Sequence, residues 1–249
     1  MRDDERCERT AMLLGSEGVE RLRRAFVAVI GLGGVGSYAA EALARAGVGR
    51  LRIVDCDVAK ATDLNRQLFA VRAGVGRPKV ELARERLLSV DPDLTLDARN
   101  AFFHADTAPA LVTPDLDFVI DAIDGLAPKV ELIRHCVARK IPVLSAMGAG
   151  GRTDPAAVRI DGINATTVCP LARLVRRKLR GLGVTEDIPV VFSTEPPRAA
   201  REAAGEGPVE TEGACLRGRP RRAQPSLPTI PGIFGLVAAN YVILRIAGG

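Results

Sequence analysis

Two cations and a carboxylate stand at spacings that suit the chemistry of nucleotide phosphates. Arg66 lies in a polar loop 11 residues after Asp55, and Lys79 follows 13 residues later at the start of a helix. Cations in loops that close over a phosphate site neutralise the charge that phosphoryl or adenylyl transfer develops. The pattern therefore favours a triphosphate over a hydride-transfer cofactor. The alternative role of Arg66 is a hydrogen bond that orders its loop, and that of Lys79 is a plain surface position.

A glycine-rich turn lies upstream of these residues. Residues 26–30 form an apolar run of strand type, and residues 37–46 have a helical pattern. The turn between them contains Gly31, Gly33, Gly34 and Gly36. Such a turn places backbone N–H groups at a positive helix N-terminus, where an anionic phosphate can approach without meeting side chains.

Acidic residues end two of the predicted strands. Asp55 lies 24 residues beyond the first glycine of the turn, where a carboxylate takes the ribose hydroxyls of a nucleotide. Asp121 and Asp124 lie at the end of a later strand, and carboxylates at such ends face the ligand crevice. One of them can hold Mg²⁺, which is satisfied by one or two carboxylates plus phosphates. The alternative for Asp124 is an N-cap of the following helix.

The elements that must position these residues alternate between strand and helix. Predicted strands lie at residues 26–30, 51–55, 94–98, 117–125 and 141–148. This alternation predicts an α/β fold with a doubly wound, mostly parallel, Rossmann-like sheet and helices on both faces. The single glycine turn favours one domain over residues 1–249.

Composition narrows the functional classes. Of the 249 residues, 47% are hydrophobic, which is enough for a substantial core. The formal charge of +5 makes a polyanion a plausible partner, although a solvated surface is the ordinary meaning of such an excess. The five cysteines form no C-x-x-C pair, so we expect neither a disulfide framework nor zinc. The two histidines lie far apart in sequence and give little support to a His-dependent triad.

The ends of the chain show no targeting pattern. The charged N-terminus has no apolar segment behind it, so we expect no secretory signal and a cytoplasmic protein. The apolar run at residues 230–244 is shorter than the ~20 residues that span a bilayer. It therefore predicts a buried C-terminal helix and no transmembrane segment.

Several motifs resemble one known family when they are taken together. GLGGVGS, VDCD, NRQ, GRPKVE and VIDAID occur in the order and at the spacings of the E1-like adenylating superfamily, which includes ThiF, MoeB and HesA. Further segments resemble its tRNA threonylcarbamoyladenosine dehydratase branch, namely ERCERTAMLLG, EALARAGVG, MGAGGRTDP, CPLARLVRRKLR, VVFSTEPP and LPTIPGIFGLVAAN. Sulfur-carrier activators of the superfamily usually carry two C-x-x-C pairs for zinc, which this chain lacks.

The resemblance implies a homodimer that binds ATP and Mg²⁺ and acts on tRNA. The four glycines of the turn would cradle the nucleotide, and Asp55 would bind its ribose. Arg66 and Lys79 would bind the phosphates, and Asp124 would hold the metal. Arg9 sits where the superfamily supplies an arginine from the adjacent subunit to the same triphosphate. The resemblance leaves open a structural monovalent cation and a sulfur-relay protein partner.

The implied reaction has two steps. The threonyl carboxylate of threonylcarbamoyladenosine, next to the anticodon, attacks the α-phosphate of ATP and forms an acyl-adenylate. A nucleophile of the same modified side chain then closes a ring and expels AMP, with net loss of water. The enzyme would contribute orientation and charge neutralisation.

A basic segment suits an RNA substrate. Arginines recur at i, i+3, i+4 and i+7 opposite an apolar stripe, at Arg173, Arg176, Arg177 and Arg180. A helix anchored by that stripe would present guanidinium groups to RNA phosphates. The alternative is an ordinary basic surface helix, or one that binds acidic lipid or a protein partner.

The chain departs from the family pattern at several positions. The dehydratases commonly carry Lys at the position of Ala165, Asn at that of Asp63 and Ser at that of Gly125. Residues 196–225 are rich in Pro, Gly and charge and predict a flexible loop, with residues 226–249 returning to the core as a strand or helix. Cys215 lies in this loop, in the region where related activators keep a catalytic cysteine, but no flanking motif supports that role.

Three other functions are weighed against the dehydratase. An activator of a ubiquitin-like sulfur carrier shares the ATP chemistry but adenylates a protein C-terminus. An NAD-dependent oxidoreductase uses a similar glycine turn but leaves Arg66 and Lys79 unexplained. A catalytically inactive RNA-binding scaffold would not need Lys79 or Asp124.

Overall fold

The computed structural model describes residues 5–199, 209–210, 221–222 and 224–248, and a seven-stranded sheet forms its centre. The strand order is β3-β2-β1-β4-β5-β7-β6; the first six run parallel, and β6 is antiparallel to β7. The bounds are β1 Phe26–Ile30, β2 Arg50–Asp55, β3 Thr95–Asn100, β4 Phe118–Asp121, β5 Val143–Ala146, β6 Val158–Gly162 and β7 Pro189–Ser193. The order reverses between β1 and β4, whose carboxyl ends therefore border the crevice in which such sheets bind ligands.

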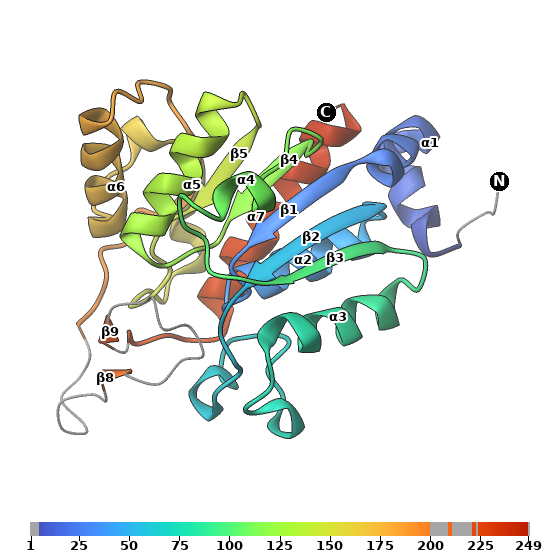
Figure 1. Cartoon of the computed structure of the whole chain (residues 1–249), viewed down its shortest axis with the longest axis horizontal. Coiled ribbons are helices and arrows are strands. Elements are labelled where there is room, and N and C mark those ends of the chain that lie inside the picture. Colours follow the sequence, from blue (N-terminus) through green and yellow to red (C-terminus); the bar gives the residue numbers. More distant parts are fainter. Residues whose placement is uncertain (1–4, 200–208, 211–220, 223, 249) are drawn as a thin grey trace.

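Helices cover both faces of the sheet (Figure 1). Their bounds are α1 Glu8–Arg24, α2 Gly36–Arg45, α3 Lys79–Val90, α4 Ala108–Leu111, α5 Leu126–Ala138, α6 Pro170–Gly181 and α7 Thr229–Ala247. One core cluster joins α2, α3, α7 and the end of α1 to one face, and a second joins α4, α5 and α6 to the other. The doubly wound α/β architecture expected from the sequence is confirmed.

The central strand β1 is buried along its whole length. Val27 and Val29 belong to the first core cluster, whereas Phe26, Ala28 and Ile30 belong to the second. Because successive side chains of a strand point to opposite faces, both faces of a covered parallel strand must be apolar. This is why the sequence ahead of the glycine turn is continuously hydrophobic.

The C-terminal apolar run forms α7, which packs beside α2. A Cβ atom on Gly235 would lie 2.3 Å from the carbonyl oxygen of Val35, so this glycine lets α7 approach the start of α2. By length and composition α7 could cross a membrane, but half of its apolar window is buried within the fold, and Phe234 and Val242 are fully covered. The helix therefore belongs to the core.

The structure adjusts several element bounds. The strands expected at 117–125 and 141–148 end earlier, at Asp121 and Ala146, and the residues beyond them form loops at the crevice. The inner strand β7 and the edge strand β6 are not among the strands predicted from the sequence. Of the loop predicted at 196–225, most lies outside the described residues, as does Cys215; the short strands β8 Val209–Glu210 and β9 Arg221–Arg222 pair antiparallel.

Candidate active site

The glycine turn between β1 and α2 packs against the loop that follows β4. Gly31 has a φ of +96°, and a Cβ atom there would lie 2.8 Å from the carbonyl oxygen of Ala122. A Cβ atom on Gly36 would lie 1.8 Å from the carbonyl oxygen of Gly31, so side chains are excluded at both positions. A Cβ atom on Gly33 would meet no atom within 4 Å. Gly31 and Gly36 therefore shape the turn, and Gly33 borders open space.

The start of α2 is available to an anion. Within the described chain, no side chain caps this helix end, although the N–H groups of Ser37 and Ala39 donate to the carbonyl oxygens of Gly33 and Val35. A Cβ atom on Gly34 would lie 3.0 Å from Pro231 of α7 and 3.3 Å from Cγ of Arg66. The beginning of α7 and the Arg66 loop thus flank the turn on this side.

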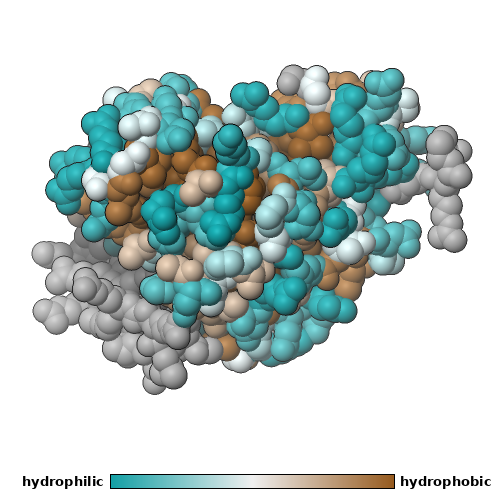
Figure 2. All heavy atoms as spheres, turned by 45° about the horizontal axis from the view of Figure 1, so that its top comes forward, coloured by the Kyte–Doolittle hydropathy of each residue, from teal (hydrophilic) through white to brown (hydrophobic). Residues whose placement is uncertain are grey.

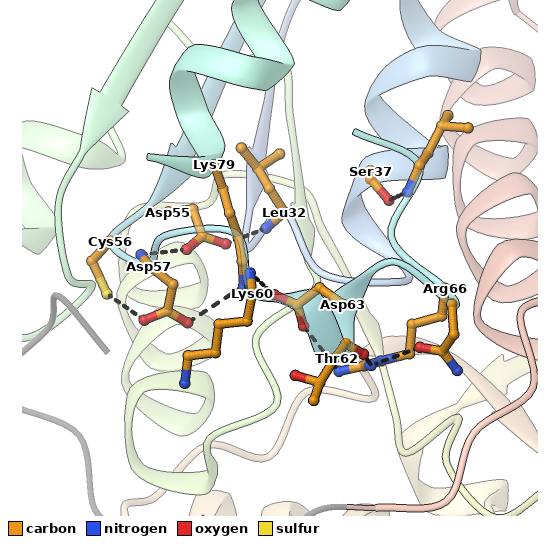
Figure 3. A network of polar contacts seen from close by, with 12 residues as sticks. Leu32, Ser37, Asp55, Cys56, Asp57, Lys60, Thr62, Asp63, Arg66 and Lys79 are labelled. Atoms are coloured by element: carbon orange, nitrogen blue, oxygen red, sulfur yellow. Dashed lines mark hydrogen bonds and ion pairs between the residues drawn. The ribbon is translucent and has the colours of Figure 1, made fainter. Parts of the chain in front are cut away.

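Asp55 ties the glycine turn to the end of β2. Its Oδ2 accepts a hydrogen bond of 2.7 Å from the Leu32 N–H, and its Oδ1 accepts one of 2.8 Å from the Asp57 N–H (Figure 3). Burial raises the pKa of Asp55, against the lowering effect of the nearby Lys79 ammonium and of these N–H donors. The residue is half-buried, and its two backbone N–H donors fix the carboxylate in place.

Lys79, the first residue of α3, points back toward the loop that follows β2 (Figure 3). Its Nζ lies 3.6 Å from Oδ2 of Asp57 and 3.8 Å from Oδ2 of Asp63, and its side chain is 11% exposed. Burial lowers the pKa of Lys79, but four surrounding aspartates, led by Asp55 and including Asp124, outweigh burial and raise it above the ordinary value. Lys79 is therefore a protonated and largely enclosed cation, not a plain surface residue.

Arg66 lies on the other side of Asp63. One guanidinium nitrogen is 3.3 Å from Oδ1 of Asp63, and the other donates to the carbonyl oxygen of Thr62 at 2.8 Å and to Oδ1 of Asn65 at 3.0 Å. Arg66 thus orders its own loop in this structure, which is the alternative role considered from the sequence. Its side chain is partly exposed beside the glycine turn, where it can also meet a ligand.

The two acids at the end of β4 have different surroundings. Asp124 is exposed in the loop and contributes to the electrostatic field at Lys79. Its alternative role as an N-cap does not apply, because the N-cap position of α5 is Gly125. Asp121 is fully buried and paired with the buried Lys129, so the expectation that both acids line the ligand site is corrected for Asp121.

Asp121 belongs to a buried network that sequence reasoning missed. Lys129 of α5 is fully buried, and its Nζ donates to Oδ2 of Asp121 at 2.7 Å, to Oγ of Ser145 at 3.1 Å and to the carbonyl oxygen of Ala146 at 2.9 Å. Oδ1 of Asp121 accepts from the Ile123 N–H at 3.0 Å. The network joins β4, β5 and α5 beneath the loop that carries Asp124. Its signal in the sequence is a lysine four residues before Ile133, on the apolar stripe of the helix.

Within one chain, Arg9 lies far from these residues. It is exposed near the start of α1, one helical turn after Arg6, which pairs with Asp91 at the far end of α3. The 12 residues of α3 separate that end from Lys79 by about 18 Å. The structure of a single chain therefore does not bring Arg9 to the phosphate cluster.

The arginines of α6 divide into two kinds. Arg173, Arg177 and Arg180 are exposed, and Arg180 donates to Oδ1 of Asn164 at 2.9 Å. Arg176 is half-buried, and one of its nitrogens donates to the carbonyl oxygen of Ile163 at 2.8 Å and to Oγ1 of Thr166 at 2.7 Å. Arg176 thus supports the preceding turn of the chain, and RNA contact stays a prediction for the others.

The doubly wound sheet, with a glycine turn at its reversal of strand order and a cationic cluster beside that turn, defines a nucleotide-binding α/β protein. Comparison with known sequences makes the class specific. The chain belongs to the ThiF family, whose sequence model matches residues 7–249.

Two relatives resemble the chain over nearly its whole length. The tRNA threonylcarbamoyladenosine dehydratase of Bacillus subtilis is 39% identical over 236 residues, which cover 95% of this chain and 92% of that protein. The crystal structure of the Escherichia coli tRNA N6-threonylcarbamoyladenosine dehydratase TcdA in complex with ATP matches with a TM-score of 0.86 at 31% identity, covering 98% of this chain and 94% of TcdA. The molybdopterin-synthase adenylyltransferase of Escherichia coli is 36% identical but over 146 residues, 59% of this chain and 55% of that protein.

Proposed function

We propose that this protein catalyses the ATP-dependent dehydration of threonylcarbamoyladenosine in tRNA, which closes the modified side chain into a ring. The observation that carries the proposal is the match in length and fold to dehydratases, one of them with ATP bound. Lys79 and Arg66 beside an uncapped helix start support it, because they form a site suited to a triphosphate.

The proposed reaction consumes one ATP. In the first step a carboxylate oxygen of the threonyl group attacks the α-phosphorus, a P–O bond forms, and the bond to pyrophosphate breaks. In the second step a nucleophile of the same side chain attacks the activated carbonyl carbon, releases a proton and expels AMP. The oxygen lost from the nucleoside leaves in AMP, so the net change in the nucleoside is the loss of one water.

Each residue of the site has a place in this scheme. The N–H groups near Gly33 and the side chains of Lys79 and Arg66 hold the phosphates and offset the charge that develops on pyrophosphate. Asp55, anchored to the glycine turn, accepts from the ribose hydroxyls. Together these contacts hold the α-phosphorus at the mouth of the crevice, where the tRNA carboxylate can approach it.

The residues present also suit Mg²⁺ at Asp124. This carboxylate is exposed and close enough to Lys79 to influence its pKa, so nucleotide phosphates and the metal would share it. When bound, Mg²⁺ neutralises phosphate charge. Asp55, Cys56 and Asp57 also bring three ligand atoms within 4.8 Å of one another, but we assign no metal there because Lys79 already faces Asp57.

A homodimer would complete the site. Met12 and Leu13 of α1 are 81% and 83% exposed, and Leu236 of α7, a helix that packs against α1, is 49% exposed. Figure 2 shows that apolar residues also reach the surface in patches bordered by hydrophilic side chains. Burial of such side chains against a second copy would be favourable. It would also let Arg9, on the same helix, reach the phosphate cluster of the partner.

The proposal places the enzyme in the cytoplasm. No disulfide joins the four cysteines among the described residues, and three of these cysteines are buried. Burial raises the pKa of Cys136 to about 12, so its thiol is unreactive at neutral pH. Cysteines that form no disulfide suit a reducing compartment.

The proposal is tested with recombinant protein, ATP, Mg²⁺ and tRNA that carries threonylcarbamoyladenosine. Mass spectrometry of the digested tRNA should show a nucleoside lighter by one water, formed by the wild type and by Glu85→Gln but not by Lys79→Ala. Glu85 is a suitable control because it is an exposed acid on the same helix as Lys79 and pairs with Arg77.

Two results would overturn the proposal. Pyrophosphate exchange that depends on a carrier protein ending in Gly-Gly, and not on modified tRNA, would indicate a sulfur-carrier activator. Tight binding of NADH without binding of ATP would indicate an oxidoreductase.

A further inference from the structure

Asp63 is a buried acid that the proposed reaction does not use. It is 5% exposed and lies between the two cations assigned to the phosphates. Its Oδ1 is 3.3 Å from the Arg66 guanidinium, and its Oδ2 is 3.8 Å from Nζ of Lys79 (Figure 3). One carboxylate therefore serves as the shared counter-ion of both cations.

The chain holds this carboxylate rigidly. Its Oδ2 accepts a hydrogen bond of 3.1 Å from the Lys60 N–H, and its backbone carbonyl accepts from the N–H groups of Arg66 at 3.1 Å and Gln67 at 2.9 Å. Lys79 and Arg66 reach it through long side chains with several rotatable bonds. When a ligand enters, the cations can shift toward it, whereas Asp63 stays.

Asp63 adds to an excess of negative charge. Among the described residues, four aspartates act on Lys79, namely Asp55, Asp57, Asp63 and Asp124. Asp55 is explained by its bonds to the glycine turn, and Asp124 faces solvent where a metal can join it. Asp63 has no such part in binding a nucleotide, and its charge opposes any anion that approaches Lys79 and Arg66.

We propose that Asp63 is an internal counter-ion that positions Lys79 and Arg66 in the nucleotide-free protein and weakens the binding of polyphosphates. The proposal rests on the assignment of Lys79 and Arg66 to the phosphates of ATP. A fixed carboxylate repels each added ligand charge, so the effect grows from adenosine to ATP. It acts equally on pyrophosphate, and its consequence is faster release of that product.

The test is Asp63→Asn, which removes the charge but keeps the shape and an oxygen that can accept from the Lys60 N–H. Calorimetric titration at fixed Mg²⁺ with adenosine, AMP, ADP, ATP and pyrophosphate gives an affinity for each charge. We expect ATP and pyrophosphate to bind about tenfold more tightly, AMP less than threefold more tightly and adenosine unchanged, because a unit charge acts over several ångströms at intermediate dielectric. The KM for ATP should fall without a rise in kcat, because pyrophosphate leaves more slowly.

Two further variants control the experiment. Glu85→Gln removes a carboxylate from the same region of α3 without touching the cluster, and all five affinities should stay within twofold of the wild type. Asp63→Ser also removes the charge, and it should reproduce the graded effect if the asparagine variant folds poorly, as judged by thermal unfolding.

The outcomes separate this inference from the proposed function. A uniform loss of affinity for all ligands would mean that Asp63 only supports the loop, and a change below twofold for ATP would mean that its charge does not matter; either result overturns the inference. If Lys79→Ala binds ATP as tightly as the wild type, the phosphate site itself is wrongly assigned, whatever Asp63→Asn does.

Discussion

Lys79 and Lys129 both face aspartates at the carboxyl end of the same sheet, yet they are held very differently. Lys129 is fully buried, and its three donors are taken by Asp121, Ser145 and the Ala146 carbonyl oxygen at 2.7 to 3.1 Å. Lys79 is 11% exposed, and its ion pairs, at 3.6 and 3.8 Å, are longer than hydrogen bonds. A saturated cation holds the fold together, whereas a loosely paired one can change partners.

Substitution of the fully buried Lys129 gives the largest expected loss of stability. Lys129→Met keeps a long apolar stem but leaves Asp121 without its counter-charge in the interior. Removal of one partner of a buried pair costs about 3–5 kcal/mol, so the free energy of unfolding should fall by that amount. Urea denaturation measures it.

A double variant sharpens this result. Lys129→Met with Asp121→Asn removes the stranded charge, so it should be more stable than Lys129→Met alone. Equal stability of the single and double variants would show that the charge of Asp121 is not what the lysine compensates, and the comparison would lose its basis.

Substitution of Lys79 should affect activity more than stability. Lys79→Met should lower dehydratase activity by about 100-fold, because a charge that meets the reacting phosphates is lost. Its free energy of unfolding should fall less than that of Lys129→Met, since the Lys79 ion pairs are longer than hydrogen bonds and Asp63 keeps its pairing with Arg66. Parallel activity assays and urea titrations of the two methionine variants check the contrast. A large loss of stability in Lys79→Met would show that both lysines are structural.

The two lysines also differ in whether their roles could be predicted from the sequence. Lys79 was found because Pro78 and the spacing from Asp55 put a cation at a helix start beside a glycine turn. Lys129 was missed because its partners are remote in sequence: Ser145 lies 16 residues away, on another strand. Asp63 was noticed as a departure from the family pattern, but its two cations could be assigned only once the loop was folded around it.

The same limit applies to the fold. The parallel centre of the sheet was predictable because covered strands are continuously apolar. The edge strand β6 was not, because its five residues alternate between half-buried and exposed positions and give a weak signal. The inner strand β7 was also missed, although its residues 190–193 are buried like those of the other covered strands. The strands predicted at 117–125 and 141–148 extend beyond the observed ends of β4 and β5. Pairing with neighbouring strands, not local hydrophobicity, decides where β4 and β5 stop.

A third prediction concerns whether Arg9 of a second subunit contributes to the phosphate site of Lys79. If Arg9 acts in the partner's site, a mixture of Arg9→Ala and Lys79→Ala subunits forms heterodimers with one intact site. Random exchange between such dimers should restore about a quarter of the wild-type activity. The measurement is activity before and after subunit exchange, with each variant alone as the control. If the mixture is no more active than its components, Arg9 does not act across the dimer.

The smallest effects are expected on α6, where Arg176 and Arg177 repeat the contrast one residue apart. Arg176→Ala removes the donor to the Thr166 hydroxyl and one of two side-chain donors to the Ile163 carbonyl oxygen, so it should lower the free energy of unfolding by about 1–2 kcal/mol. Arg177→Ala should leave stability unchanged but weaken tRNA binding and reduce the slope of log affinity against log salt by about one. Binding measured over a range of salt concentrations separates the two. If Arg177→Ala leaves the slope unchanged, this face of α6 does not meet RNA phosphates, and exposure alone does not mark a cation as ready for a ligand.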